Sequence, residues 1–349
     1  MEAKLNDWHR QLDLKHPIVA APMAGVSTPP LADAVTSAGA LGALAVGAQS
    51  ATAVEGALRE TSALASAAVM ANFFCHPRPR DDADEEQRWL AALQDAFEQQ
   101  GASAPSEVTT PYESFDERPE LIDLILDYRV RVASFHFGLP KARTLARLKR
   151  AGVCLFATAT CASEARVLAA AGIDVIVAQG WEAGGHRGNF TSAPDEQLGT
   201  LSLLRRLRGA VDLPIIAAGG IVDGAGVAAA FAAGAQGVQC GTAFVPTPES
   251  AAAPAYRAAL AAGEQDTVMT AGFSGRAARG LRNRFVESFA TLPPIDYPRA
   301  YGVVKSLVAA AEARGDHGLT PMWAGQSYPD ARAASTAEIV DRLADGLPN

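Results

Sequence analysis

Short apolar runs alternate with longer alanine-rich stretches along most of the chain. Apolar runs of this length, bounded by turn residues, predict buried strands, and the longer stretches predict helices. The predicted strands are residues 16–23, 41–46, 67–74, 130–137, 153–159, 174–179, 214–218 and 237–244. The helices predicted between them are residues 30–37, 51–64, 140–150, 161–171, 201–207 and 224–232. This alternation predicts a parallel sheet whose strands are joined by crossover helices.

The number of strand and helix units favours an α/β fold of the (β/α)8 TIM barrel type. Several units also share a helix end of small residues with a glycine, followed at once by a strand, as at residues 37–42, 170–174 and 232–237. A glycine there caps the helix and turns the chain back toward the sheet. An open doubly wound sheet is the alternative.

Two stretches interrupt the rhythm and set the expected domain boundaries. The barrel is expected over residues 1–75 and 129–248, with residues 76–128 as an elaborated crossover that holds helices near 86–98 and 118–127. From residue 249 the pattern becomes irregular. A barrel of this type takes about 250 residues. We therefore expect residues 249–320 to form a smaller, mainly helical substrate or cap domain, and residues 321–349 to pack back on the barrel.

The most informative segment is the glycine-rich loop after the sixth predicted strand, which reads AQGWEAGGHRG over residues 178–188. Loops at the carboxyl ends of barrel strands usually carry chemistry. The glycines allow close approach to a flat ligand, while Gln179 and His186 supply polar groups. The competing interpretation is a glycine-rich turn with a solvated histidine.

The seventh and eighth predicted strands both end in glycine, at Gly219, Gly220 and Gly241. Barrels of this kind often bind a phosphate between these two loops, through backbone N–H groups. The Thr242 hydroxyl could donate to a phosphate oxygen. A phosphate site is therefore predicted here.

Two further residues are candidates for a flat-ring ligand. Met23, in the turn after the first strand, offers a soft apolar surface that suits an isoalloxazine ring, although a core methionine is the simpler interpretation. Asn72 is an amide inside an apolar strand, which is costly unless it is hydrogen-bonded, either to a ligand or within the fold.

The motifs APMAGVST at 21–28, AQGWEAGGHRG at 178–188, AAGGI at 217–221 and QCGTAF at 239–244 together resemble those of the nitronate monooxygenases, formerly called 2-nitropropane dioxygenases. The resemblance covers nearly the whole chain and implies FMN as cofactor, without a metal. The residues it assigns to FMN are Asn72, Gln179, Gly184, Gly220, Gln239, Cys240, Gly241 and Thr242. Candidates for the substrate pocket are Ala24, His136 and Ser274.

The activity that the resemblance implies is oxidative denitrification of alkyl nitronates, such as propionate 3-nitronate. The nitronate passes one electron to FMN through a flavin semiquinone, the reduced flavin reacts with O2, and the substrate yields a carbonyl compound and nitrite. His186 is expected to bind the nitronate and to act as base toward a neutral nitroalkane. Related flavin barrels place a lysine after the fifth strand, where this chain has only Thr158 as a polar candidate.

Other functions stay open. A flavin-dependent enoyl reductase or an NADH:quinone reductase would use the same scaffold with a reduced nicotinamide. A non-catalytic flavin or phosphate binder is a third interpretation, against which His186 argues.

Composition narrows the partners. Thirty Lys and Arg against 38 Asp and Glu give a net charge of −8, which argues against nucleic acid or an anionic membrane. Residues 1–7 lack the order of a signal peptide, so a cytoplasmic location is expected. Four separated cysteines favour reduced thiols over disulfides or zinc. Small-residue helices are compatible with a homodimer.

Overall fold

The computed structural model describes residues 8–64, 68–191 and 194–348. The predicted strand start at residue 67, the segment 1–7 and residue 349 lie outside this part of the chain. Within it, eight parallel strands form one sheet in the order β1-β9-β8-β6-β5-β4-β3-β2. The strands are β1 (Ile18–Ala20), β2 (Gly42–Ala45), β3 (Val69–Phe74), β4 (Val132–His136), β5 (Cys154–Ala159), β6 (Val175–Gln179), β8 (Ile215–Ala218) and β9 (Val238–Cys240).

The sheet closes into a barrel between its first and second strands. Val19 forms a parallel bridge with Leu41, and the Leu41 amide donates to the Ile18 carbonyl at 2.8 Å. The predicted (β/α)8 barrel is therefore confirmed. The eighth predicted strand was too long, because the chain leaves the sheet after Cys240 and residues Thr242–Phe244 form the 3-10 helix η3.

Helices surround the barrel as the sequence pattern predicts. They are α2 (Pro29–Ser37), α3 (Ala51–Leu64), α5 (Glu120–Asp127), α6 (Ala142–Arg150), α7 (Ala162–Ala170), α8 (Thr200–Arg208), α9 (Gly224–Ala232) and α13 (Thr336–Ala344). Short 3-10 helices η1 (Arg10–Leu12), η2 (Phe115–Glu117) and η4 (Tyr328–Asp330) lie in the connections. The C-terminal helix α13 contributes Ile339, Val340 and Leu343 to the layer between helices and barrel.

Alternate residues of the strands face two different cores, so each strand is apolar on both sides. In β6, Ile176 and Ala178 pack outward under the helices, while Val175 and Val177 fill the barrel interior. Trp8 closes the amino-terminal end of that interior, since its indole N–H donates to the Gln236 carbonyl at 2.9 Å. The amino-terminal end is thus filled by packing, and the polar loops lie at the carboxyl ends of the strands.

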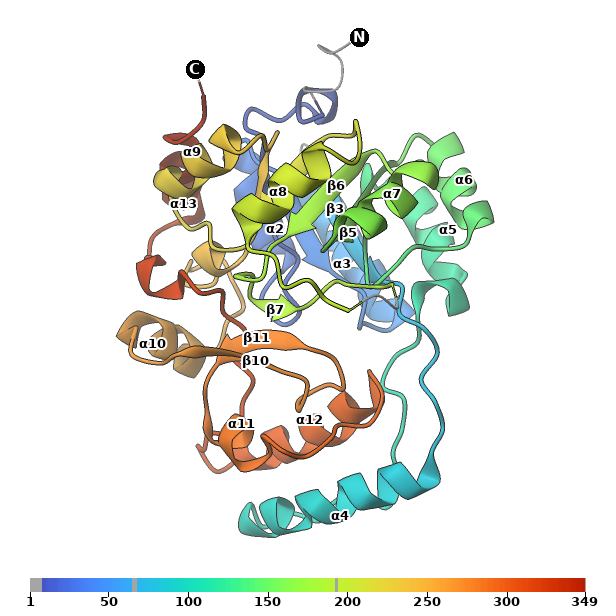
Figure 1. The fold of residues 1–349 in the computed structure, drawn as a ribbon, viewed down its shortest axis with the longest axis vertical. Coiled ribbons are helices and arrows are strands. Elements are labelled where there is room, and N and C mark those ends of the chain that lie inside the picture. The colour runs from blue at the N-terminus through green and yellow to red at the C-terminus, as the bar shows by residue number, and fades with distance from the viewer. Residues whose placement is uncertain (1–7, 65–67, 192–193, 349) are drawn as a thin grey trace.

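A second layer lies over the carboxyl ends of the barrel strands (Figure 1). It contains a three-stranded antiparallel sheet of β10 (Thr267–Thr270), β11 (Ala278–Leu281) and β7 (Gly185–His186), with β11 in the middle. The helices of this layer are α4 (Ala83–Gln99), α10 (Pro254–Ala262), α11 (Arg284–Ser288) and α12 (Arg299–Glu312). We call this layer the cap.

The cap is built from two separate parts of the chain. Trp89, Leu93 and Phe97 of α4 pack in one apolar core with Val304 and Leu307 of α12. The segment expected to be only an elaborated crossover therefore supplies a cap helix. The antiparallel sheet, which sequence reasoning did not foresee, joins this cap to the loop after β6.

Candidate active site

The loop after β6 is held tightly against helix α8. The Glu182 carboxylate accepts hydrogen bonds from the Thr200 amide at 2.8 Å and from the Thr200 hydroxyl at 2.9 Å. A Cβ at Gly180 would lie 2.0 Å from the Thr200 hydroxyl oxygen, so only glycine fits there. The glycine-rich sequence thus reflects close packing of the loop as well as conformational freedom.

His186 lies in strand β7, where it pairs with Ala278 of β11. Its ring is enclosed by three aromatic side chains, with ring centroids at 5.8 Å for Phe137, 5.5 Å for Tyr297 and 5.4 Å for Trp323. Strand β7 belongs to the cap sheet, whereas Phe137 follows barrel strand β4. The histidine therefore lies at the junction between the barrel and the cap.

Ser274 fixes the tautomer of His186. The Ser274 hydroxyl donates its single proton to the Arg276 carbonyl at 3.1 Å, so its oxygen accepts from His186 Nε2 at 2.8 Å. His186 Nδ1 has no hydrogen bond to any residue of the described chain. The imidazole therefore keeps an unshared lone pair on Nδ1, the atom available to act as a base.

The surroundings keep this ring neutral. Burial, followed by the nearby His136 and Arg276, lowers the pKa of His186 to about 3. Burial is also the main reason that the pKa of His136 falls to about 4. At neutral pH both rings are uncharged, so His186 is suited to accept a proton and not to donate one.

His136 supports the main chain of His186. Its Nε2 donates to the His186 carbonyl at 3.1 Å, and its Nδ1 accepts from the Thr158 hydroxyl at 3.0 Å. Thr158, the candidate for the position of the absent lysine, is thereby engaged with His136. This geometry gives His136 a positioning role beside the pocket.

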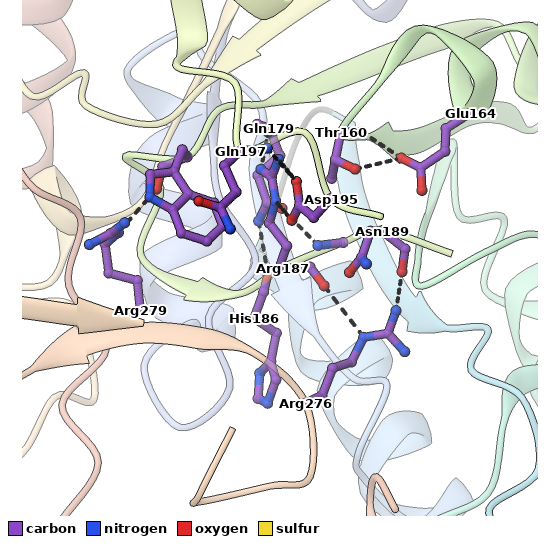
Figure 2. Close-up of polar contacts among 12 residues, drawn as sticks. Thr160, Glu164, Gln179, His186, Arg187, Asn189, Asp195, Gln197, Arg276 and Arg279 are labelled. Carbon is purple, nitrogen blue, oxygen red and sulfur yellow. Dashed lines mark hydrogen bonds and ion pairs between the residues drawn. The ribbon is translucent and has the colours of Figure 1, made fainter. Parts of the chain in front are cut away.

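Gln179 and Arg187 hold the same loop from the barrel side, as Figure 2 shows. Gln179 donates to the His186 carbonyl at 2.9 Å and accepts from the Gly188 amide at 2.7 Å. Arg187, with a side chain only 1% exposed, forms an ion pair with Asp195 at 2.7 Å and also donates to the Gln179 carbonyl. The Gln179 amide is thus occupied by the loop itself, and its contact with a cofactor stays a prediction.

The predicted phosphate end lies where β6, β8 and β9 finish side by side. Register pairs Gln179 with Ala218 and Ala218 with Gln239, so the glycines that follow β8 and β9 lie at one edge. Gly219 and Gly220 have φ angles of +119° and +71°, a region that favours glycine. Gln239 Oε1 is buried without a hydrogen-bond partner.

The C-terminal segment borders this edge. The Gly325 amide donates to the Thr242 hydroxyl oxygen at 3.1 Å, and the Ser327 hydroxyl donates to the Gly220 carbonyl at 3.0 Å. A Cβ at Gly184 would lie 2.6 Å from the Gly325 nitrogen, so the histidine loop also packs on this segment.

The remaining candidates are placed at varying distances from His186. Met23 packs beside Gly241, since a Cβ at Gly241 would lie 3.5 Å from the Met23 sulfur, and Cys240 is a buried free thiol. Ala24 lies exposed in the turn after β1, with no contact to the histidine loop in the described chain. Asn72 donates to the Ser134 carbonyl and hydroxyl, both at 3.3 Å, so its amide has partners within the sheet.

Sequence reasoning missed the aromatic walls of the site. Tyr112 donates to the Tyr297 hydroxyl at 2.8 Å, and Trp323 contacts the His186 ring at 5.4 Å. These three residues come from three distant segments, and no local motif marks them. The only available signal was the position of Tyr112 inside a stretch that is too long for a simple crossover.

Comparison with known proteins now decides the family. A family model described as nitronate monooxygenase matches residues 8–346. The chain is 48% identical to a nitronate monooxygenase of Paraburkholderia phytofirmans, over 95% of this chain and 92% of the relative. It is 43% identical to one of Pseudomonas aeruginosa, over 97% and 98%. The chain belongs to the nitronate monooxygenase family.

Solved structures agree with this family. The fold matches a structure titled nitroalkane oxidase from Streptomyces ansochromogenes with a TM-score of 0.87 and 37% identity, over 96% of both chains. It matches FabK from Thermotoga maritima with a TM-score of 0.73 and 27% identity, over 96% of this chain and 93% of that one. As a nitronate monooxygenase family member the protein is an oxidoreductase, and the family is flavin-dependent.

Two structural searches add to this picture. Within residues 8–64, 68–191 and 194–348, no helix is long and apolar enough to cross a bilayer. In the same part of the chain, no three His, Cys, Asp or Glu side chains converge in a way that could hold a metal ion. The polar side chains of this family member's site instead converge on His186 and on the phosphate edge.

Proposed function

We propose that the protein catalyses the FMN-dependent oxidation of alkyl nitronates by O2 to carbonyl compounds and nitrite. The observation that carries the proposal is a neutral His186 with a free Nδ1, enclosed by aromatic rings, beside a glycine-lined edge. Membership of the nitronate monooxygenase family supports the same reaction.

The residues at the edge of β8 and β9 are compatible with FMN. Gln239 Oε1 is a buried acceptor that needs a donor, and the flavin ring carries an N–H that could supply one. Gly219, Gly220, Gly241 and Thr242 would hold the phosphate, with Met23 against the ring. When bound, FMN would supply the electron transfer and the reaction with O2.

The chain's own contribution is binding and proton handling. The aromatic enclosure excludes water, which strengthens each polar contact that the nitronate makes. His186 Nδ1 would accept the Cα proton of a neutral nitroalkane, while Ser274 holds Nε2–H and keeps the ring in this tautomer. His136 and Gln179 hold the His186 carbonyl and so fix where the ring points.

A substitution of His186 tests this role. We expect His186→Asn to retain FMN, because the loop contacts use the main chain of His186, and to lower kcat/KM for a neutral nitroalkane by about 100-fold or more. The measurement is O2 uptake together with nitrite release. His317→Asn, which changes an exposed histidine, is the matched control and should keep wild-type rates. Wild-type kinetics for His186→Asn would contradict the role.

A second experiment separates the proposed oxidase reaction from a reductase on the same scaffold. The purified protein is mixed without oxygen with NADH and, separately, with propionate 3-nitronate, and flavin absorbance is followed. Rapid bleaching by NADH alone would favour an enoyl or quinone reductase. A protein that cannot be loaded with FMN would overturn the proposal altogether.

A further inference from the structure

One arginine beside the site has no acidic partner. Arg276 donates to the Arg187 carbonyl at 3.4 Å and to the Asn189 carbonyl, and no ion pair links it to a carboxylate in the described part of the chain. Glu164, whose charge acts on Arg276, gives its oxygens to the Thr160 amide and the Phe190 amide, both at 2.7 Å. The Nη1 nitrogen of Arg276 makes no hydrogen bond to these residues, so a half-buried cation retains free donors.

This guanidinium lies on the substrate side of the histidine loop. Its Cζ atom is 4.4 Å from the centroid of the Phe137 ring, and the same ring is 5.8 Å from His186 and 5.1 Å from Tyr297. Figure 2 shows Arg276 and His186 entering the same region from neighbouring strands. Because Tyr297 receives the proton of Tyr112, its own hydroxyl proton is free for a ligand.

A second unsatisfied group lies beyond Tyr297. His76 is 4% exposed, and its ring centroid is 5.2 Å from that of Tyr297. Its Nδ1 donates to the Pro77 carbonyl at 3.0 Å, while its Nε2 is buried without a partner. A buried ring nitrogen without a partner destabilises the fold unless a ligand or water satisfies it, so this atom marks a polar compartment.

We propose that Arg276, Tyr297 and His76 form a subsite for a carboxylate carried by the substrate, separate from the nitronate group that reacts beside His186. This inference rests on the proposed function and deepens it. Tyr297 lies between His186 and His76, so a short ligand with an anionic group at each end would reach both. A carboxylate there would also favour the protonated His76 ring, whose Nε2 would then donate to it.

The arrangement makes Arg276 a specificity-determining residue. A simple alkyl nitronate would leave the guanidinium without an anionic partner, whereas a carboxylate would accept charge-assisted hydrogen bonds from it. Such bonds to charged groups correspond to roughly 10- to 100-fold in binding. The loss of Arg276 should therefore fall on carboxylate-bearing substrates only.

The test compares two nitronates in the FMN-loaded enzyme: propionate 3-nitronate and propyl-1-nitronate, which lacks the carboxylate. We expect Arg276→Gln to lower kcat/KM for the first by about 10- to 100-fold, mainly through KM, and for the second by less than about threefold. Arg276→Lys should restore part of the preference. Arg282→Gln, which removes an exposed arginine nearby, is the control and should leave the ratio of the two substrates unchanged.

Equilibrium binding of 3-nitropropionate and 1-nitropropane separates this inference from the proposed function. Preferential binding of 3-nitropropionate that Arg276→Gln abolishes would support the subsite even if no nitronate is oxidised. An equal loss for both nitronates would overturn it, since Arg276 would then act on the nitronate or on the fold. If Arg276→Gln does not fold, His76→Gln provides the same comparison: a loss confined to the carboxylate-bearing compound supports the subsite, and no selective loss overturns it.

Discussion

Acid should destabilise this protein through the two histidines of the site. The pKa of His186 is lowered to about 3 and that of His136 to about 4, in both cases mainly by burial, whereas an unfolded histidine titrates near 6.5. Between these limits the unfolded chain binds more protons than the folded one. The free energy of unfolding should therefore be highest above about pH 6.5 and should fall as the pH drops toward 4.

The size of the effect follows from the same values. From about pH 7 to pH 5, each ring should lower the free energy of unfolding by about 2 kcal/mol, and both together by up to about 4 kcal/mol. This is an upper figure because both side chains keep some accessible surface and because each ring affects the other. For a domain of ordinary stability it is a large fraction of the total.

The assay is urea denaturation of flavin-free protein at the two pH values, so that cofactor binding adds no pH dependence of its own. The quantity compared is the change in unfolding free energy between pH values within each variant, which cancels the general cost of a substitution. His186→Asn should reduce the change by about 2 kcal/mol, and the exposed control His317→Asn should not alter it. An identical pH dependence in wild type and His186→Asn would refute the reasoning.

Two further substitutions test the contacts that hold the loop. Gly184→Ala would place a Cβ 2.6 Å from the main chain of Ala324 and Gly325, so we expect FMN affinity, measured by fluorescence titration, to fall about 5- to 100-fold. Gly56→Ala, whose Cβ meets nothing within 4 Å, should leave FMN affinity unchanged. Asp195→Asn should lower the free energy of unfolding by about 3 kcal/mol because it leaves buried Arg187 without a counter-charge. Asp13→Asn, which breaks the exposed pair with Arg131, should cost at most about 1 kcal/mol, and equal losses for the two aspartate variants would contradict this account.

The barrel could be predicted from sequence because its strands are buried on both faces. A strand such as Val175–Gln179 is almost continuously apolar, and the helix ends at Gly39, Gly172 and Gly234 punctuate the chain in a way that local physics explains. The loop with His186 and the glycine edge at Gly219 and Gly220 follow these strands directly, so their positions came with the strands.

The cap could not be predicted in the same way. Strand β7 is only two residues long, and it exists because β11, more than ninety residues away in sequence, pairs with it. Strand β10 is half-buried throughout, so it has no alternation of buried and exposed positions that would identify it. Tyr112, Tyr297 and Trp323 meet around His186 only after both parts of the cap have packed together.

This dependence has a consequence for His186. The barrel fixes the carbonyl of His186 through Gln179 and His136, but the ring is fixed through Ser274, which belongs to the cap segment before β11. The ring orientation therefore depends on how the cap core of α4 and α12 packs, although none of those helices contributes a group to the proposed proton transfer. Substitutions in that core should change kcat through the geometry of His186 while leaving the residues that would hold FMN in place.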